Sequence, residues 1–138
     1  MQVVVVGQGY VGLPLALTLA EKNMICYGLD TSRKKVNNLS AGKQNLDQNF
    51  SVNMQKILKK RKYIPTLDYS VILKADVVVV CLPTPLNLFN KPSLSIIENS
   101  LKKISKMIKK RETQTIKILK AGSFIFLGEL DIGIKLLC

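Results

Sequence analysis

The residues most able to do chemistry lie within the first thirty. Gly7, Gly9 and Gly12 form a G-x-G-x-x-G pattern that follows a run of valines and precedes apolar residues at helical spacing. Glycines in this setting let the backbone approach a pyrophosphate, and the helix that follows offers its unpaired N–H groups and partial positive charge to the phosphates. The pattern therefore predicts a dinucleotide-binding turn.

An acidic residue follows at a suitable distance. Asp30 comes 18 residues after Gly12, close to the spacing of about 20 that is typical of the acid that binds the adenine-side ribose. A carboxylate there repels the 2′-phosphate of NADP, so the sequence favours NAD, although the basic run Arg33-Lys34-Lys35 weakens that preference. The alternative is that the glycines only form a tight turn and that Asp30 only caps the next helix.

A strand, a helix and a second strand must position these groups. Residues 2–6 are a β-branched run suited to a buried parallel strand, residues 11–21 carry apolar side chains at helical spacing, and residues 24–29 form another short apolar run. Together they predict a βαβ unit of about 30 residues. Later elements are expected as helices at 32–39 and 54–62, a strand at 64–66, one or two helical turns at 68–74, a central strand at 77–82, a long helix from Ser93 or Ser95 to about 108, and a fifth strand at 115–119 that Lys117 interrupts.

The fold class that follows is α/β, a Rossmann-type doubly wound parallel sheet that is incomplete at its C-terminal end. We expect an NAD-binding domain over residues 1–119. Residues 120–138 have no clear hydrophobic period and are expected to form a divergent tail, either frame-shifted or disordered.

Composition narrows the possible functions. The chain has 138 residues, of which 47% are hydrophobic, so one domain can bury a sizeable core, and it contains neither His nor Trp. A His acid or base and a His-containing metal site are therefore excluded. The net charge of +12 would attract nucleic acid, anionic lipid or phosphorylated small molecules. Because the Lys clusters at 56–62 and 102–111 are not interleaved with aromatic residues, we interpret them as solvated helix faces and expect no nucleic-acid partner.

Cysteine usage and hydropathy indicate the compartment. Cys26, Cys81 and Cys138 are scattered, with no C-x-x-C pair, which predicts a reduced cytoplasmic protein without a metal site. No apolar run approaches the roughly 20 residues of a membrane span, so no membrane partner is expected.

Four motifs resemble one family. The segment from Val5 to Ala16 reads V-x-G-x-G-Y-V-G-L-P-L-A and resembles the NAD domain of the UDP-glucose/GDP-mannose dehydrogenase family, the nucleotide-sugar dehydrogenases. The resemblance spans residues 2–110, and Tyr10-Val11-Gly12-Leu13-Pro14 with Pro83-Thr84-Pro85 is its most specific part. The other matching stretches are Gly28-x-Asp30 followed by Lys35-Val36 and Leu39-x-x-Gly42, Ala75-Asp76 before the central strand, and Leu82 to Leu86.

The resemblance implies an oligomeric enzyme of polysaccharide biosynthesis. Such an enzyme oxidises the C6 hydroxyl of a nucleotide sugar (UDP-glucose, UDP-N-acetylglucosamine or UDP-N-acetylmannosamine) to a carboxylate, with two hydride transfers to NAD. By resemblance, Asp30 would bind the ribose, Arg33 or Lys34 would flank the adenosine, and Pro83 with Thr84 would form a wall near the cofactor. Thr84 could instead only cap a turn. The pyrophosphate would be lined by Gly7, Gly9, Tyr10, Val11 and Gly12.

No catalytic residue is predicted in this chain, since the family takes its cysteine nucleophile, lysine and acid from regions further downstream. Cys26 and Cys81 fall in expected core strands and are interpreted as small buried hydrophobes. After the long helix the family continues with a strand ending in Glu-Ser-Thr and a Pro-Gly turn, and residues 111–138 match neither. We therefore expect about the first third of a family member, truncated or with its reading frame lost near Arg111.

Two other functions remain open from the sequence. The chain could be a stand-alone NAD-binding module without catalysis. It could also be a domain of a 3-hydroxyacid or 6-phosphogluconate type of dehydrogenase, against which the Pro83-Thr84-Pro85 motif argues.

Overall fold

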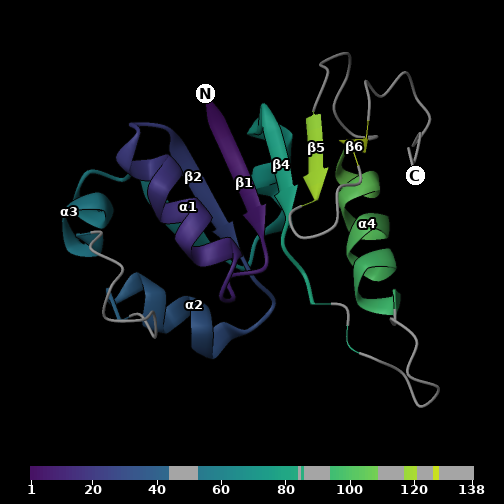
Figure 1. Cartoon of the computed structure of the whole chain (residues 1–138), viewed down its shortest axis with the longest axis horizontal. Coiled ribbons are helices and arrows are strands. Elements are labelled where there is room, and N and C mark those ends of the chain that lie inside the picture. The colour runs from purple at the N-terminus through teal and green to yellow at the C-terminus, as the bar shows by residue number, and fades with distance from the viewer. Residues whose placement is uncertain (44–52, 84, 86–93, 109–116, 121–125, 128–138) are drawn as a thin grey trace.

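A mostly parallel sheet, whose two middle strands are runs of valine, forms the centre of the structure. The structure is a computed structural model that describes residues 1–43, 53–83, 85, 94–108, 117–120 and 126–127 (Figure 1). The strand order is β3-β2-β1-β4-β5-β6. Each neighbouring pair from β3 to β5 is parallel, whereas β6 is antiparallel to β5. The strands are β1 (Gln2–Val6), β2 (Ile25–Leu29), β3 (Tyr63–Thr66), β4 (Val77–Val80), β5 (Lys117–Lys120) and β6 (Phe126–Leu127).

Strand β1 is central because its residues are apolar on both faces. Residues 3–6 are four valines with almost no exposed surface, and they pair with β2 on one side and β4 on the other. Continuous β-branched runs of this kind are typical of strands covered by helices on both faces. The predicted bounds of this strand are confirmed.

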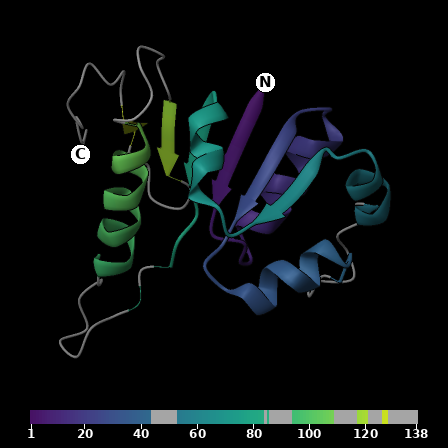
Figure 2. The same cartoon turned by 180° about the vertical axis from the view of Figure 1, so that it is seen from behind.

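Helices cover both faces of the sheet (Figures 1 and 2). Helices α1 (Gly12–Glu21) and α3 (Met54–Lys59) pack on one face, in a core that contains Val3, Val5, Leu17 and Tyr63. The 3₁₀ helix η1 (Tyr69–Lys74) and α4 (Ser95–Ile108) pack on the other, around Val4, Val6, Ile72 and Ile104. Helix α2 (Arg33–Ser40) follows β2 and lies beyond the carboxyl ends of the strands. The doubly wound α/β prediction is confirmed.

Several predicted boundaries differ from the structure. Helix α3 ends at Lys59 rather than at residue 62, because Arg61 has a φ of 52° and the chain there turns into β3. Strand β4 ends at Val80 rather than at residue 82. The helical turns expected at 68–74 are present as a 3₁₀ helix over Tyr69–Lys74. The fifth strand is present at Lys117–Lys120, two residues later than expected at its start.

The C-terminal segment contains one element that the sequence did not indicate. Strand β6 pairs with β5 through Ile118↔Leu127 and Leu119↔Phe126. Most of residues 120–138 lie outside the described residues, so the domain boundary at residue 119 stays a prediction.

Candidate functional site

The turn between β1 and α1 is anchored to the ends of the two neighbouring strands. The Gly7 N–H donates to the Leu29 carbonyl at the end of β2 (2.7 Å), and the Cys81 N–H donates to the Val6 carbonyl (2.8 Å). Gly7 has a φ of +91°, and a Cβ at this position would overlap the Cys81 carbonyl oxygen. Only glycine combines this backbone conformation with so close an approach to β4. We call residues 7–12 the glycine loop.

The other two glycines of the loop have opposite surroundings. A Cβ on Gly12 would overlap the Gly7 carbonyl oxygen, so this glycine lets α1 pack closely on the loop. A Cβ on Gly9 would meet nothing within 4 Å. The chain itself therefore does not need a glycine at position 9, and the open space beside it fits the approach of a ligand.

The amino end of α1 is suited to an anion. The N-cap residue Val11 provides no side-chain hydrogen bond, and the first turn carries no acidic residue. Within the first turn of α1 the Leu13 N–H donates to the Gly9 carbonyl (3.1 Å) and Pro14 has no N–H. The Gly12 N–H and the partial positive charge of the helix end are therefore what an anion would meet there. Tyr10 beside this helix end is 88% exposed, so the loop presents an aromatic side chain to its surroundings.

Asp30 lies directly beside the glycine loop, at the carboxyl end of β2. Its side chain is buried, with 8% of its surface exposed, and it accepts three hydrogen bonds, from the Gln8 N–H (2.8 Å), the Ser32 N–H (2.9 Å) and the Lys35 ammonium (2.7 Å). Ser32, not Asp30, is the N-cap of α2, and its hydroxyl accepts from the Lys35 N–H (3.3 Å). Asp30 therefore joins the loop to α2 rather than only capping the helix.

The ionised form of Asp30 is favoured by its partners. Burial alone would raise the pKa of this carboxyl, but the Lys35 ammonium and the amides of Ser32 and Gln8 outweigh burial and hold the pKa below its ordinary value. Asp30 is thus a carboxylate at neutral pH. Lys35 is less buried than Asp30, with 42% of its side chain exposed, so the pair has one buried and one solvated member.

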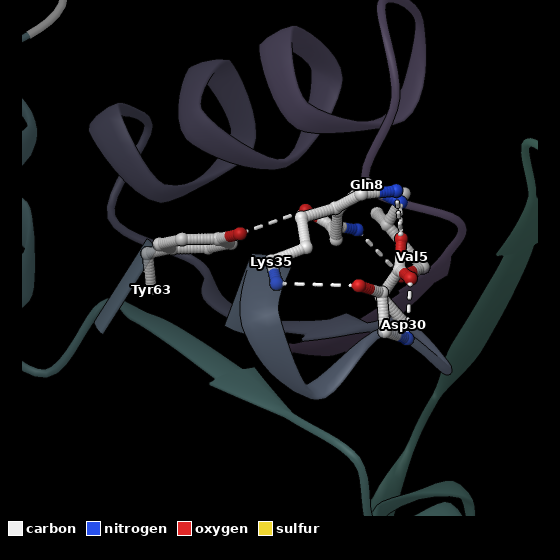
Figure 3. A network of polar contacts seen from close by, with 6 residues as sticks. Val5, Gln8, Asp30, Lys35 and Tyr63 are labelled. Atoms are coloured by element: carbon white, nitrogen blue, oxygen red, sulfur yellow. Dashed lines mark hydrogen bonds and ion pairs between the residues drawn. The ribbon is translucent and has the colours of Figure 1, made fainter. Parts of the chain in front are cut away.

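Gln8, the residue between the first two glycines, turns its side chain into the protein (Figure 3). Its amide nitrogen donates to the Val5 carbonyl (2.8 Å), and its amide oxygen accepts from the Tyr63 hydroxyl (2.7 Å). Both side chains are buried. Sequence reasoning missed this pair, since nothing in the motif indicates that Tyr63 of β3 reaches the glycine loop.

The structure separates the remaining predicted site residues. Arg33 and Lys34, expected to flank the adenosine, begin α2 as exposed side chains. The cation that contacts Asp30 is Lys35. The Lys35-Val36 motif in the sequence was the signal that could have identified Lys35 as the partner of Asp30. Pro83 is exposed beyond the end of β4, and Thr84 lies outside the described residues.

A cavity of about 260 Å³ opens between the glycine loop and α2. Its lining combines an aromatic and two aliphatic side chains with two ammonium groups, which suits a ligand that is partly apolar and carries negative charge. The lining residues are Gln8, Gly9, Tyr10, Leu13, Lys35, Asn38, Leu39 and Lys43.

The thiols that the structure describes are poor nucleophiles. Burial raises the pKa of Cys26 to about 12, and burial also raises the pKa of the half-buried Cys81. A nucleophilic cysteine needs the opposite shift. Within the described ranges no group of three His, Cys, Asp or Glu side chains could hold a metal ion, and no helix there is long and apolar enough to cross a membrane.

The strand order, the glycine loop and the acid at the end of β2 define a dinucleotide-binding Rossmann domain. The sequence model described as the UDP-glucose/GDP-mannose dehydrogenase family, NAD binding domain, matches residues 1–123. The chain belongs to this family, and the cofactor of the domain is NAD.

Similar proteins agree with this assignment. The chain is 33% identical over 106 residues to Protein CapL of Staphylococcus aureus, covering 77% of this chain and 24% of CapL. It is 29% identical over 110 residues to a UDP-N-acetyl-D-glucosamine 6-dehydrogenase of Pseudomonas aeruginosa, covering 80% and 25%. A solved GDP-mannose dehydrogenase of Pseudomonas aeruginosa has the same fold, with a TM-score of 0.80 and 24% identity over 87% of this chain and 28% of that one. The chain thus spans about a quarter of the length of these relatives.

Proposed function

We propose that this chain is the NAD-binding part of an enzyme that oxidises the C6 hydroxyl of a UDP-sugar to a carboxylate. The family assignment supports the reaction class, and one relative is a UDP-N-acetyl-D-glucosamine 6-dehydrogenase. The observation that most supports a binding role for this chain is the pairing of an open face at Gly9 with an ionised Asp30 that accepts from the adjacent Gln8 N–H. A phosphate-binding turn and a ribose-binding acid then share one edge of the sheet.

Each group of residues has a separate task in this proposal. Gly7 and Gly12 shape the glycine loop and Gly9 leaves room for the pyrophosphate. The Gly12 N–H and the partial positive charge at the amino end of α1 bind the pyrophosphate oxygens. Tyr10 and Val11 complete the loop surface against the cofactor. Asp30 accepts hydrogen bonds from the ribose hydroxyls, and Lys35 keeps that carboxylate ionised and oriented.

The remaining sites are proposed on the resemblance. Arg33 flanks the adenosine from the start of α2, and Pro83 with Thr84 forms the wall beyond β4. When bound, NAD accepts the hydride from the sugar carbon. Neither Cys26 nor Cys81 is assigned to the covalent chemistry, because burial raises the pKa of both thiols. We propose that the groups which hold the nucleotide sugar, and the contacts that assemble the family's oligomer, come from elsewhere in the enzyme.

Calorimetric titration of the 138-residue chain with NAD tests the binding role, with Gly9→Ala as the decisive variant. The added methyl group meets no protein atom within 4 Å, so the variant should fold as well as the unaltered chain. Because that methyl group occupies the space left for the pyrophosphate, NAD binding should weaken at least ten-fold. Equal affinity of the two proteins for NAD would contradict the assignment of the loop.

The second candidate is an NAD-binding module without catalysis of its own. This candidate is supported by the length of the match, since the chain aligns with only about a quarter of each of these relatives. Release of NADH from NAD and a UDP-sugar by the 138-residue chain alone would exclude this alternative.

A further inference from the structure

The buried pair of Tyr63 and Gln8 couples strand β3 to the glycine loop, although β3 lies two strands away from β1 in the sheet. The two residues are 55 positions apart in sequence, and the hydroxyl of Tyr63 donates to the Gln8 amide oxygen at 2.7 Å. Only 1% of Tyr63 and 3% of Gln8 is exposed to solvent. Water therefore does not compete for this hydrogen bond, and either partner left alone would be a buried, unsatisfied group.

A missing side chain on β2 makes the coupling possible. Tyr63 pairs with Cys26 in the sheet, and Gly28 lies two residues further along the same face of β2. A Cβ on Gly28 would lie 2.5 Å from the Tyr63 hydroxyl oxygen and 2.8 Å from the Gln8 amide oxygen. The Tyr63 ring can thus cross β2 to reach the loop only because position 28 has no side chain.

The side chain and the backbone N–H of Gln8 are hydrogen-bonded to other groups of the protein (Figure 3). The side-chain amide nitrogen donates to the Val5 carbonyl, the side-chain oxygen accepts from Tyr63, and the backbone N–H donates to Asp30. Holding the side chain at both ends fixes the backbone of Gln8. That backbone in turn sets the position of the glycine loop relative to the Asp30 carboxylate.

We infer that Tyr63 is a positioning residue for the dinucleotide: through Gln8 it holds the phosphate-binding loop and the ribose-binding acid in their relative positions. This inference rests on the proposed NAD-binding function. It assigns no contact between Tyr63 and the cofactor. Burial, together with the nearby Asp30 carboxylate, raises the pKa of Tyr63 above its usual value, so the hydroxyl remains a donor throughout the physiological range.

The test compares two Tyr→Phe variants that lose the same kind of hydrogen bond. Tyr63→Phe removes the donor to Gln8 and keeps the ring that packs in the core. Tyr27→Phe removes a hydroxyl that donates to the amide oxygen of Gln2 at 3.4 Å, away from the glycine loop. NAD affinity is measured by calorimetry at a temperature at which circular dichroism shows every variant to be fully folded. Hydrogen exchange of the Gln8 backbone N–H is measured by NMR without NAD.

We expect Tyr63→Phe to raise the dissociation constant for NAD about five- to thirty-fold, because a buried acceptor loses its donor. The backbone N–H of Gln8 should also exchange faster, since its hydrogen bond to Asp30 depends on the Gln8 side chain being held by Tyr63. Tyr27→Phe should change NAD affinity less than about two-fold. A purely structural role for Tyr63 would lower the melting temperature but leave the affinity of the fully folded protein and the Gln8 exchange rate unchanged, and that result would overturn the inference.

A double variant tests whether Tyr63 acts through Gln8. In a Gln8→Leu background, the further change Tyr63→Phe should alter NAD affinity less than about two-fold, because the interaction it removes is already absent. Additive effects would overturn the inference. If Tyr63→Phe alone does not fold, the Gln8→Leu variant provides the test. Unchanged NAD affinity in Gln8→Leu would also overturn the inference.

The two proposals fail in different ways. If the unaltered chain does not bind NAD, the proposed function is wrong, and Gln8 amide exchange still decides whether Tyr63 holds the loop. If the unaltered chain binds NAD and Tyr63→Phe binds it equally well, the proposed function stands and the positioning role does not.

Discussion

Replacing Asp30 by Asn should weaken NAD binding and destabilise the chain at the same time. The carboxylate accepts from three donors, the amides of Gln8 and Ser32 and the ammonium of Lys35. An asparagine side chain has one acceptor oxygen and one NH₂ group. In either orientation of that amide, its NH₂ group faces at least one of these donors, and the negative charge that stabilised all three is lost.

The expected magnitudes follow from this donor count. One unsatisfied buried donor costs about 1 to 3 kcal/mol of unfolding free energy. For a domain of this size, that corresponds to a fall in melting temperature of about 4 °C per kcal/mol. Lys35 adds little, because its half-exposed ammonium can turn to water. A ribose hydroxyl that loses a charged acceptor costs a further 1.5 to 3 kcal/mol of binding, which weakens NAD about ten- to 150-fold.

NADP provides the sharper measurement. The variant removes the carboxylate that repels the 2′-phosphate and leaves Lys35 free to attract it, so NADP should lose less affinity than NAD or gain some. Calorimetry with both nucleotides on Asp30→Asn gives the two ratios. Asp76→Asn is the matched control, because Asp76 accepts from the Gln2 N–H (2.7 Å), at the start of β1 and away from the glycine loop. Tighter binding of NADP than of NAD by the unaltered chain, or equal losses for both nucleotides in Asp30→Asn, would refute the role given to Asp30.

Three further outcomes are expected. Gly12→Ala should destabilise the chain by about 3 kcal/mol or more in chemical denaturation, because its methyl group would overlap the Gly7 carbonyl oxygen; a loss below 1 kcal/mol would show that α1 can move away from the loop. Since the folded-state pKa of Asp30 is lowered, its contribution to stability should be fully present above about pH 4, near the unfolded-state pKa. It should be lost as the pH falls through the lowered folded-state pKa. Melting temperatures between pH 7 and 3 should therefore fall more steeply for the unaltered chain than for Asp30→Asn, and parallel curves would disprove the shift. The 138-residue chain should release no NADH from NAD and a UDP-sugar, because hydride transfer needs a substrate held about 3 to 3.5 Å from its acceptor and neither described thiol is activated; steady turnover that is lost in Cys81→Ser would place the nucleophile in this chain.

The first βαβ unit could be predicted from the sequence because its signals are local. The bounds of β1 agree with the prediction, and those of α1 and β2 differ from it by one residue at their starts. The end of α3 could not be predicted in the same way. Its lysine-rich sequence continues to favour a helix, and the change of direction depends on the left-handed backbone of Arg61, a residue type that rarely adopts it.

In the candidate site, too, contacts between residues close in sequence could be predicted and a contact between distant residues could not. Ser32 and Lys35 lie two and five residues from Asp30 in sequence, so their approach to it is set by one turn and the start of one helix. Tyr63 lies 55 residues from Gln8 and reaches it only because β3 pairs with β2 in a particular register. A shift of one residue in that register would turn Tyr63 to the other face of the sheet. Sequence spacing alone therefore cannot indicate this contact.

The glycines show why a motif needs the structure to assign its parts. Gly12 and Gly28 are required by the chain itself, since a side chain at either would overlap the Gly7 carbonyl oxygen or the Tyr63 hydroxyl. Gly9 has the same residue type and no such neighbour, since a methyl group there would meet no protein atom within 4 Å. Loss of stability on substitution thus identifies the glycines that shape the loop. Loss of NAD affinity without loss of stability identifies the glycine that the cofactor needs, and both measurements are required to separate the two roles.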